Sequence, residues 1–274
     1  MFDTVIEMLS YPFMTRAFLV GSLVALCSAL LGVSLVLKRY PMIGVGLSHV
    51  GFGAMAIAAA MNAAPLTVAI PVVIVAAILL LRISGNAKIK GDAAIALIST
   101  TSLAVGVMVI SLTTGMNTDV YNYMFGSILA MSAEDVKLSL VLSVFVLILF
   151  IVFYHKIFAI TFDETFARAT GVKAGVYNTL IAVLTAVTIV LGMRMMGALL
   201  ISSLIIFPAL TSMRVCRTFK SVIINAAVIS VVCLIAGVTL SYVAATPAGA
   251  SVVLANLVMM VLYTVVGAVK NHMR

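Results

Sequence analysis

Long apolar runs separated by short charged connections constrain this chain more than any other feature. A helix needs about 17 to 25 residues to cross a hydrocarbon layer about 30 Å thick. Nine runs meet this length with some slack: Phe13–Leu37, Met42–Met61, Leu66–Leu81, Ala93–Thr113, Leu138–Phe153, Val176–Met193, Met195–Met213, Val222–Ala244 and Ser251–Val269. The third and fifth runs are short, and only Arg194 separates the sixth from the seventh, so eight crossings remain possible. The runs predict an all-α, polytopic integral membrane helical bundle, with one transmembrane domain over residues 1–274.

Composition excludes a soluble globular protein. Hydrophobic residues make up 64% of the chain and charged residues only 9%, whereas soluble domains carry about 25% charged residues. The net charge of +8 does not indicate a nucleic-acid partner, because the basic residues are scattered singly between apolar runs. Cys27, Cys216 and Cys233 show no metal or disulfide spacing and are expected to act as small hydrophobic residues. Asp3 and Glu7 argue against a basic signal-peptide start.

The distribution of lysine and arginine predicts the orientation in the membrane. Of the 16 basic residues, 13 fall in five connections, which are residues 38–41, 82–91, 154–173, 214–220 and the tail from Lys270. Only Arg16, Lys137 and Arg194 fall in the others. The positive-inside rule then places the N-terminus outside and the C-terminus in the cytoplasm. An odd number of crossings is required, which favours nine over eight. Arg194 reads as an anchor at the outer interface.

His49 is the histidine that lies well inside an apolar run. Counted from Pro41 at 1.5 Å per residue, it lies about 12 Å deep. An ionisable side chain at that depth is costly unless it faces a protein cavity, so His49 is a functional-site hypothesis. It either lines a pathway or makes a hydrogen bond between helices.

The predicted outer connection between the fourth and fifth runs is not a simple turn. Residues Asp119 to Asp135 are amphipathic and too short to cross a bilayer. A half-helix or re-entrant segment beside a pathway is one interpretation, because irregular backbone at membrane depth must be covered by protein. An interfacial helix anchored by Tyr121, Tyr123 and Phe125 is the other.

The longest predicted cytoplasmic connection, His155 to Tyr177, contains the pattern of a short capped helix. Asp163 and Glu164 stand at its start, Arg168 in its last turn, and Gly171 follows as terminator. A short amphipathic helix on this face suits docking into a groove on a soluble partner. A solvated surface helix is the alternative interpretation.

Four motifs, in this order along the chain, resemble those of a known family. They are GLSHVGFGAMAIA at 46–58, FDETFARATGV at 162–172, GALLISSLIIFPALTSMRV at 197–215 and TPAGASVVL at 246–254. Over essentially its whole length, the chain resembles the membrane permease subunits of bacterial zinc and manganese ABC importers. The LSH stretch and the last motif look closer to the zinc-uptake branch.

The resemblance implies a transport subunit of the bacterial cell membrane that forms the path for zinc, with manganese and iron as alternatives. Its implied partners are a second copy of the chain, cytoplasmic ABC ATPase subunits that bind ATP, and an extracytoplasmic metal-binding lipoprotein or periplasmic protein. The chain itself would hold no cofactor. His49 would be a transient metal ligand, since neutral imidazole suits zinc. The residues that would couple the chain to the ATPase are Asp163, Glu164, Phe166, Arg168 and Gly171.

Two positions depart from the family pattern. Family members usually carry aspartate four residues before the histidine, where this chain has Val45, and often an acidic residue where it has Ala245. One neutral histidine does not offset the dehydration of a divalent cation. Three interpretations follow. Another segment of the chain supplies a ligand, or transport is impaired, or the path binds metal only transiently and an external protein selects the metal. The last interpretation is favoured, because conduction requires weak binding.

Other functional classes fit the sequence less well. No Walker A sequence occurs, so a separate chain must hydrolyse the ATP, and no HExxH motif points to an intramembrane metalloenzyme. An ion-coupled secondary transporter would commonly keep carboxylates within its spans. Here every aspartate and glutamate lies in or beside a connection.

Overall fold

The computed structural model describes residues 10–84, 91–113 and 133–272. In this part of the chain every regular element is a helix. The helices are α2 (Pro12–Leu37), α3 (Ile43–Ala60), α4 (Pro65–Ser84), α5 (Gly91–Leu112), α7 (Ala133–Val152), α8 (Tyr154–Phe162), α9 (Glu164–Ala169), α10 (Ala174–Met213), α11 (Phe219–Ala244) and α12 (Ala248–His272). The predicted all-α membrane bundle is confirmed. The predicted outer half-helix lies outside the described residues, except that positions 133–135 begin α7.

Eight of the described helices are long and apolar enough to cross a membrane. One of them, α10, has 40 residues and contains both the predicted sixth and seventh runs. A straight helix of that length would extend about 60 Å, twice the hydrocarbon thickness. Its backbone breaks at Gly197, where φ is 82° and ψ is 163°. The sequence predicts the division between the sixth and seventh runs at Arg194, three residues before the observed break. The total of nine crossings stays a prediction.

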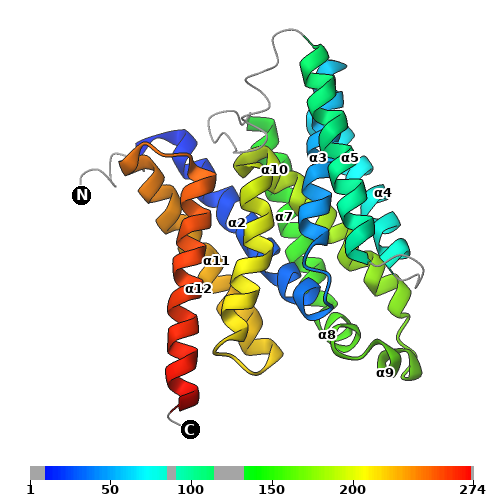
Figure 1. The fold of residues 1–274 in the computed structure, drawn as a ribbon, viewed down its shortest axis with the longest axis vertical. Helices are drawn as coiled ribbons and strands as arrows, with labels where there is room; N and C mark the ends of the chain where they lie inside the picture. Colours follow the sequence, from blue (N-terminus) through cyan, green and yellow to red (C-terminus); the bar gives the residue numbers. More distant parts are fainter. Residues whose placement is uncertain (1–9, 85–90, 114–132, 273–274) are drawn as a thin grey trace.

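The ends of the helices gather at two opposite edges of the molecule. The end of α2, helices α8 and α9, the connection from α10 to α11 and the end of α12 lie along the lower edge in Figure 1. The first half of α10, in light green, rises from this edge, and the second half, in yellow, descends to it. These connections are the ones that carry most of the basic residues. Their common edge is the arrangement that the positive-inside rule requires of a cytoplasmic face.

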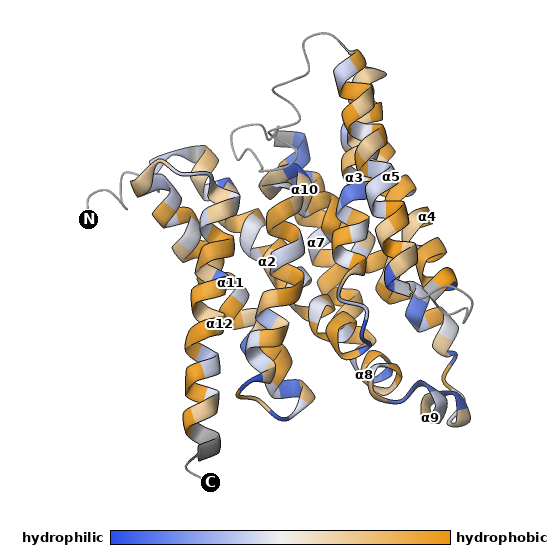
Figure 2. Cartoon of the chain, viewed as in Figure 1, coloured by the Kyte–Doolittle hydropathy of each residue, from blue (hydrophilic) through white to orange (hydrophobic). Residues whose placement is uncertain are grey.

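Helices α2, α3 and α10 form the core, and the remaining long helices surround it. Most residues in the apolar windows of these three helices are buried, whereas fewer than a third are buried in α4, α5, α7 and α12. Figure 2 shows apolar residues covering the outer helices along their length, with polar residues concentrated near helix ends. Such an exposed apolar surface suits contact with lipid rather than water.

Glycines allow the core helices to approach each other closely. A Cβ atom on Gly32 of α2 would overlap the backbone carbonyl oxygen of Ile205 in α10, so no larger residue fits without a shift of the backbone. Between α3 and α5, a Cβ on Gly53 would lie 2.7 Å from the carbonyl oxygen of Ser102. Small residues at helix contacts give membrane bundles this close packing. These contacts fix the position of α2 against α10 and of α3 against α5.

Candidate functional site

His49 lies in α3, half-buried between the core and α5. Helix α3 begins at Ile43 rather than at Pro41, so six residues separate its start from His49. At 1.5 Å per residue this is about 9 Å, less than the depth expected from the sequence. The difference arises because residues 38–42 form a turn closed by backbone hydrogen bonds from Arg39 to Val36 and from Tyr40 to Leu35.

The imidazole of His49 makes a hydrogen bond between helices. Its Nδ1 lies 2.5 Å from Oγ of Ser99 in α5, and Ser99 is buried. In the tautomer whose Nδ1–H donates to Ser99, Nε2 keeps the lone pair that a metal would accept. A hydrogen bond of this kind orients the imidazole ring of many metal sites. The two interpretations of His49 from the sequence are therefore compatible with one geometry.

Ser48 and His49 point to different neighbours. Oγ of Ser48 donates to the carbonyl oxygen of Val45 at 2.8 Å and lies 3.2 Å from Oγ of Ser202 in α10. Adjacent residues of a helix face different directions, so the two side chains cannot act as a nucleophile and its base.

The surroundings of His49 do not form a tight metal site. Val45, one turn before His49, is half-buried and supplies no ligand atom from its side chain. Within residues 10–84, 91–113 and 133–272, no three histidine, cysteine, aspartate or glutamate side chains come together in a way that could hold a metal ion. High-affinity zinc sites use three or four such ligands. His49 therefore offers one ligand atom rather than part of such a site.

The predicted coupling segment contains two helices, α8 and α9, where the sequence predicted one. The predicted cap of α9 is confirmed in detail, because Oδ1 of Asp163 accepts the backbone N–H of Phe166 at 2.9 Å. Gly171 ends the turn with φ of +83°, a conformation that favours glycine. The backbone N–H groups of Gly171 and Val172 donate to the carbonyls of Arg168 and Ala167. Asp163 and Gly171 thus define the two ends of α9.

An aromatic cluster attaches α8 to the beginning of α11. The ring of Phe219 lies 5.1 Å from that of Phe158 and 5.7 Å from that of Phe162, between ring centroids. Phe219 is buried, while Phe162 is 58% exposed and Phe166 of α9 is 65% exposed. Aromatic pairs at these distances add to the stability of a contact beyond their buried area. The cluster holds α8 in place, and two phenylalanine side chains remain available on the surface of the segment.

Glu164, the first residue of α9, is held by three side chains. Its Oε1 accepts a hydrogen bond from Arg168 at 2.6 Å, and its Oε2 accepts one from Nδ2 of Asn178 at 2.9 Å. Nζ of Lys38, just after α2, lies 3.4 Å from Oε2. Burial alone would raise the pKa of Glu164, but the hydrogen bonds from Asn178 and Arg168 and the charge of Lys38 outweigh it and lower the pKa. The carboxylate is therefore ionised at neutral pH.

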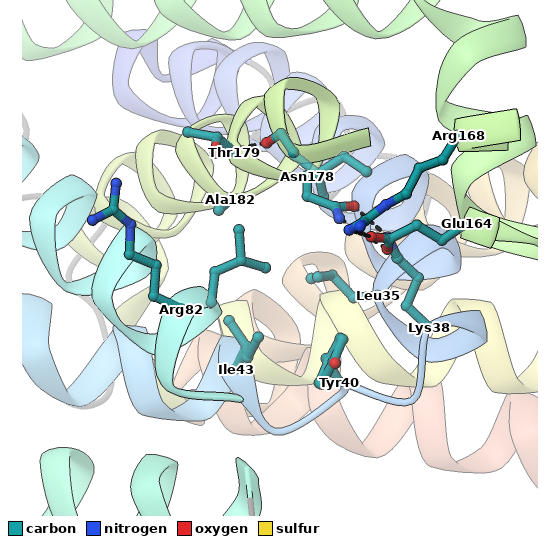
Figure 3. A pocket seen from close by; sticks show the side chains of 13 residues that line it. Leu35, Lys38, Tyr40, Ile43, Arg82, Glu164, Arg168, Asn178, Thr179 and Ala182 are labelled. Carbon is teal, nitrogen blue, oxygen red and sulfur yellow. Dashed lines mark hydrogen bonds and ion pairs between the residues drawn. The ribbon is translucent and has the colours of Figure 1, made fainter. Parts of the chain in front are cut away.

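The same residues line a cavity at this edge of the molecule (Figure 3). The cavity has a volume of about 630 Å³ and lies between the end of α2, the start of α3, the end of α4, α9 and the start of α10. Lys38, Glu164, Arg168 and Asn178 lie together on one side of it, and Arg82 lies on the other. The side chain of Lys38 is 11% exposed. Burial lowers the pKa of Lys38, and the neighbouring Glu164 opposes this effect only in part.

Lys38 and Asn178 were not identified from the sequence as site residues. Lys38 counted only as one of the basic residues that set the orientation, and Asn178 lies far from it in the chain. Only the fold brings the end of α2 and the start of α9 next to the start of α10. The structure also gives Arg194 a partner that the sequence does not predict, since its guanidinium pairs with the carboxylate of Asp135 in α7 at 3.5 Å.

Comparison with known proteins identifies the family. The ABC 3 transport family matches residues 10–267. This chain belongs to the ABC 3 transport family. The match includes nearly all of the described helices, so the predicted permease resemblance is confirmed at the level of the family.

Relatives in the ABC 3 transport family carry the names of different metals. The high-affinity zinc uptake system membrane protein ZnuB of Haemophilus influenzae is 30% identical over 90% of this chain and 94% of its own. The manganese transport system membrane protein MntC of Halalkalibacterium halodurans is 27% identical over 90% of this chain and 85% of its own. The structure of PsaBC from Streptococcus pneumoniae, in complex with Fab, superposes with a TM-score of 0.85 at 26% identity, covering 95% of this chain and 94% of that one. The chain is a multi-span membrane permease subunit of a metal ABC importer.

Proposed function

We propose that this chain forms the path for zinc in an ATP-driven importer. It works as a homodimer, with separate ATPase subunits in the cytoplasm and a metal-binding protein outside. The half-buried imidazole of His49 carries the proposal, because its Nδ1 contact with Ser99 orients the ring within α3. A single nitrogen ligand suits a metal that must be released to continue along a path. Imidazole is also a good ligand for zinc.

Manganese is the second candidate substrate. The relative from Halalkalibacterium halodurans is named for manganese transport, at an identity close to that of the zinc-named relative. Nitrogen and oxygen ligands bind several divalent first-row metals, and selectivity arises largely from geometry and availability. Because the described part of the chain contains no multi-ligand cluster, the external binding protein would select the metal. Iron follows the same reasoning.

The exposed aromatic residues support docking of α8 and α9 on the ATPase. Of the five residues that the family resemblance assigns to coupling, Asp163 and Gly171 define the ends of α9, and Glu164 and Arg168 form an ion pair at 2.6 Å. The side chain of Phe166 neither caps the helix nor forms an ion pair, and it is 65% exposed. Phe166 is therefore the residue we assign to direct contact with the ATPase, with Phe162 beside it. The other four hold the helix in its shape.

Metal uptake by cells that lack their own importers tests this function. The chain is expressed with its ATPase and its binding protein, and uptake of zinc and manganese is measured for the native chain, His49→Ala and Thr100→Ala. Thr100 is an exposed residue of α5 next to Ser99, its hydroxyl donates to the backbone of its own helix, and it serves as the control. We expect His49→Ala to lower uptake at least about ten-fold, the loss that even outer-shell changes cause at metal sites. Thr100→Ala should transport normally.

The same experiment can contradict the proposal. Full uptake by His49→Ala, at equal amounts of protein in the membrane, would place the path away from α3. Uptake of manganese but not zinc by the native chain would assign the second candidate substrate. Uptake of neither metal would exclude both.

A further inference from the structure

Lys38 and Asn178, outside the segment assigned to coupling, close a triangle with Glu164 (Figure 3). Oε2 of Glu164 accepts from Nδ2 of Asn178 at 2.9 Å and from Nζ of Lys38 at 3.4 Å. Nζ of Lys38 also donates to Oδ1 of Asn178. Each of the three side chains contacts the other two, and each comes from a different part of the fold. The triangle joins the end of α2, the start of α9 and the start of α10.

Helix α9 depends on such contacts for its orientation. It has six residues, and Ala167 is its buried one. Isolated helices shorter than about 12 to 15 residues are marginal in water. The two carboxylate oxygens of Glu164 have separate roles, since Oε1 pairs with Arg168 inside α9 and Oε2 reaches the long helices. Oε2 of Glu164 therefore connects α9 to the end of α2 and the start of α10, through the ion pair with Lys38 and the hydrogen bond from Asn178.

The ammonium of Lys38 stabilises this attachment because it is largely buried. Its side chain is 11% exposed and that of Glu164 is 33% exposed. Charge-assisted hydrogen bonds are about twice as strong as neutral ones. Removing one member of a buried pair leaves the other uncompensated, which costs more than the loss of a surface pair. A change at Lys38 should therefore loosen α9 more than the loss of one exposed lysine would.

Lys38 also occupies the corner that leads to His49. Arg39 follows it with φ of +63°, and α3 begins four residues later at Ile43. The backbone of the corner is closed by hydrogen bonds from Lys38 to Ser34 and from Tyr40 to Leu35. A displacement of Lys38 therefore moves the end of α2 and the start of α3 together. The second contact of Glu164, with Asn178, connects α9 to the first half of α10.

We propose that Lys38 and Asn178 are positioning residues that transmit movement of α9 to the corner between α2 and α3 and to the start of α10. This inference rests on the proposed function, in which an ATPase moves α9. Loss of either side chain leaves α9 able to follow the ATPase but less able to move the helix that carries His49. Zinc transport then becomes uncoupled from ATP hydrolysis, so that less zinc is delivered for each ATP hydrolysed.

The test measures zinc delivered and ATP hydrolysed in the same proteoliposomes. These contain the complete transporter, with its ATPase, and the binding protein is supplied with zinc outside. The variants are Lys38→Gln, Asn178→Leu and the conservative Lys38→Arg. The control is Lys137→Gln, which removes an exposed charge near the beginning of α7, outside the coupling segment. Coupling between sites is typically worth a factor of about 5 to 150.

We expect the zinc delivered per ATP to fall by about that factor in Lys38→Gln and in Asn178→Leu. Lys38→Arg should retain most of the native ratio, and Lys137→Gln all of it. Adding Lys38→Gln to a Glu164→Gln variant should cause little further loss, because residues of one network are not additive. If the transporter with Lys38→Gln does not assemble, the ratio measured for Asn178→Leu tests the inference, since this variant leaves the Lys38–Glu164 ion pair in place.

Two results would overturn the inference. One is an unchanged ratio of zinc to ATP in both variants, with or without an equal fall of both rates, because a merely structural role lowers the two together. The other is full additivity of the double variant. Failure of the proposed function looks different, since the transporter assembled with the native chain would then hydrolyse ATP without delivering zinc.

Discussion

At the scale of single residues, the proposed path has one imidazole, His49, and Val45 stands where the family resemblance implies a carboxylate. His49 and Val45 lie one turn apart and are both half-buried in α3. Residues four apart on a helix are neighbours, so an acidic side chain at position 45 would face the same surroundings as His49. Valine supplies no negative charge at this position. In the proposed path, we therefore expect weak metal binding and easy release.

Val45→Asp should therefore strengthen metal binding and slow release. A carboxylate and an imidazole together hold a divalent cation better than an imidazole alone. We expect the zinc concentration at half-maximal uptake to fall about ten-fold and the maximal rate to fall as well. Val45→Asn, which has nearly the same shape without the charge, is the control. An identical response of the two variants would contradict a direct role for the charge at position 45.

At the scale of elements, α10 shows how a single residue turns one long apolar stretch into two helices. Gly197 has φ of 82° and ψ of 163°, a region of the backbone map that is essentially restricted to glycine. Close by, a Cβ on Gly192 would overlap the side chain of Ile201, so the two halves pack tightly around the break. The break allows both halves to pack against the core helix α2 within the thickness of a bilayer.

Gly197→Ala should destabilise the protein. A side chain at this φ and ψ costs about 1–3 kcal/mol, and we expect a lower thermal unfolding midpoint in detergent and less folded protein. Gly175→Ala, in the first turn of the same helix, is the matched control, because no atom lies within 4 Å of its added Cβ. Alanine in a helix is favoured over glycine by about 0.5–1 kcal/mol, so the control should be neutral or slightly stabilising. Equal destabilisation by both changes would contradict the special role of Gly197.

Much of the element structure could be predicted from the sequence because apolar runs and caps are local signals. The helix ends at Leu37 and Ala60 lie within a residue of the predicted ones, and Asp163 and Gly171 end α9 as expected. The sequence predicts the division of α10 at Arg194 because a charge interrupts the apolar run there, whereas the structure pairs this charge with Asp135 of α7 and breaks the helix at Gly197. The triangle around Glu164 was missed because Lys38 and Asn178 meet only after three helices pack. Signals that depend on distant parts of the chain are not visible in a local pattern.

At the scale of the whole molecule, the two halves of α10 decide the topology. Lys173 directly precedes α10, and Arg217 follows it by four residues. If both halves cross the bilayer, these two residues lie on the same face, and the total is nine crossings. If α10 crosses once, they lie on opposite faces, and the total is eight. The basic residues at the common edge of the fold favour the first arrangement.

Cysteine labelling in intact cells distinguishes the two topologies. Lys173→Cys and Arg217→Cys are exposed positions, and Asn62→Cys marks the turn between α3 and α4 on the other side. Cys216 is replaced by serine, whereas Cys27 and Cys233 are buried and should not react. We expect a membrane-impermeant maleimide to label Asn62→Cys in intact cells, and Lys173→Cys and Arg217→Cys only after the membrane is opened. Labelling of Lys173→Cys and Arg217→Cys from opposite sides would establish eight crossings. It would also move the α10–α11 connection to the face opposite α8 and α9, and so remove it from the surface proposed to meet the ATPase.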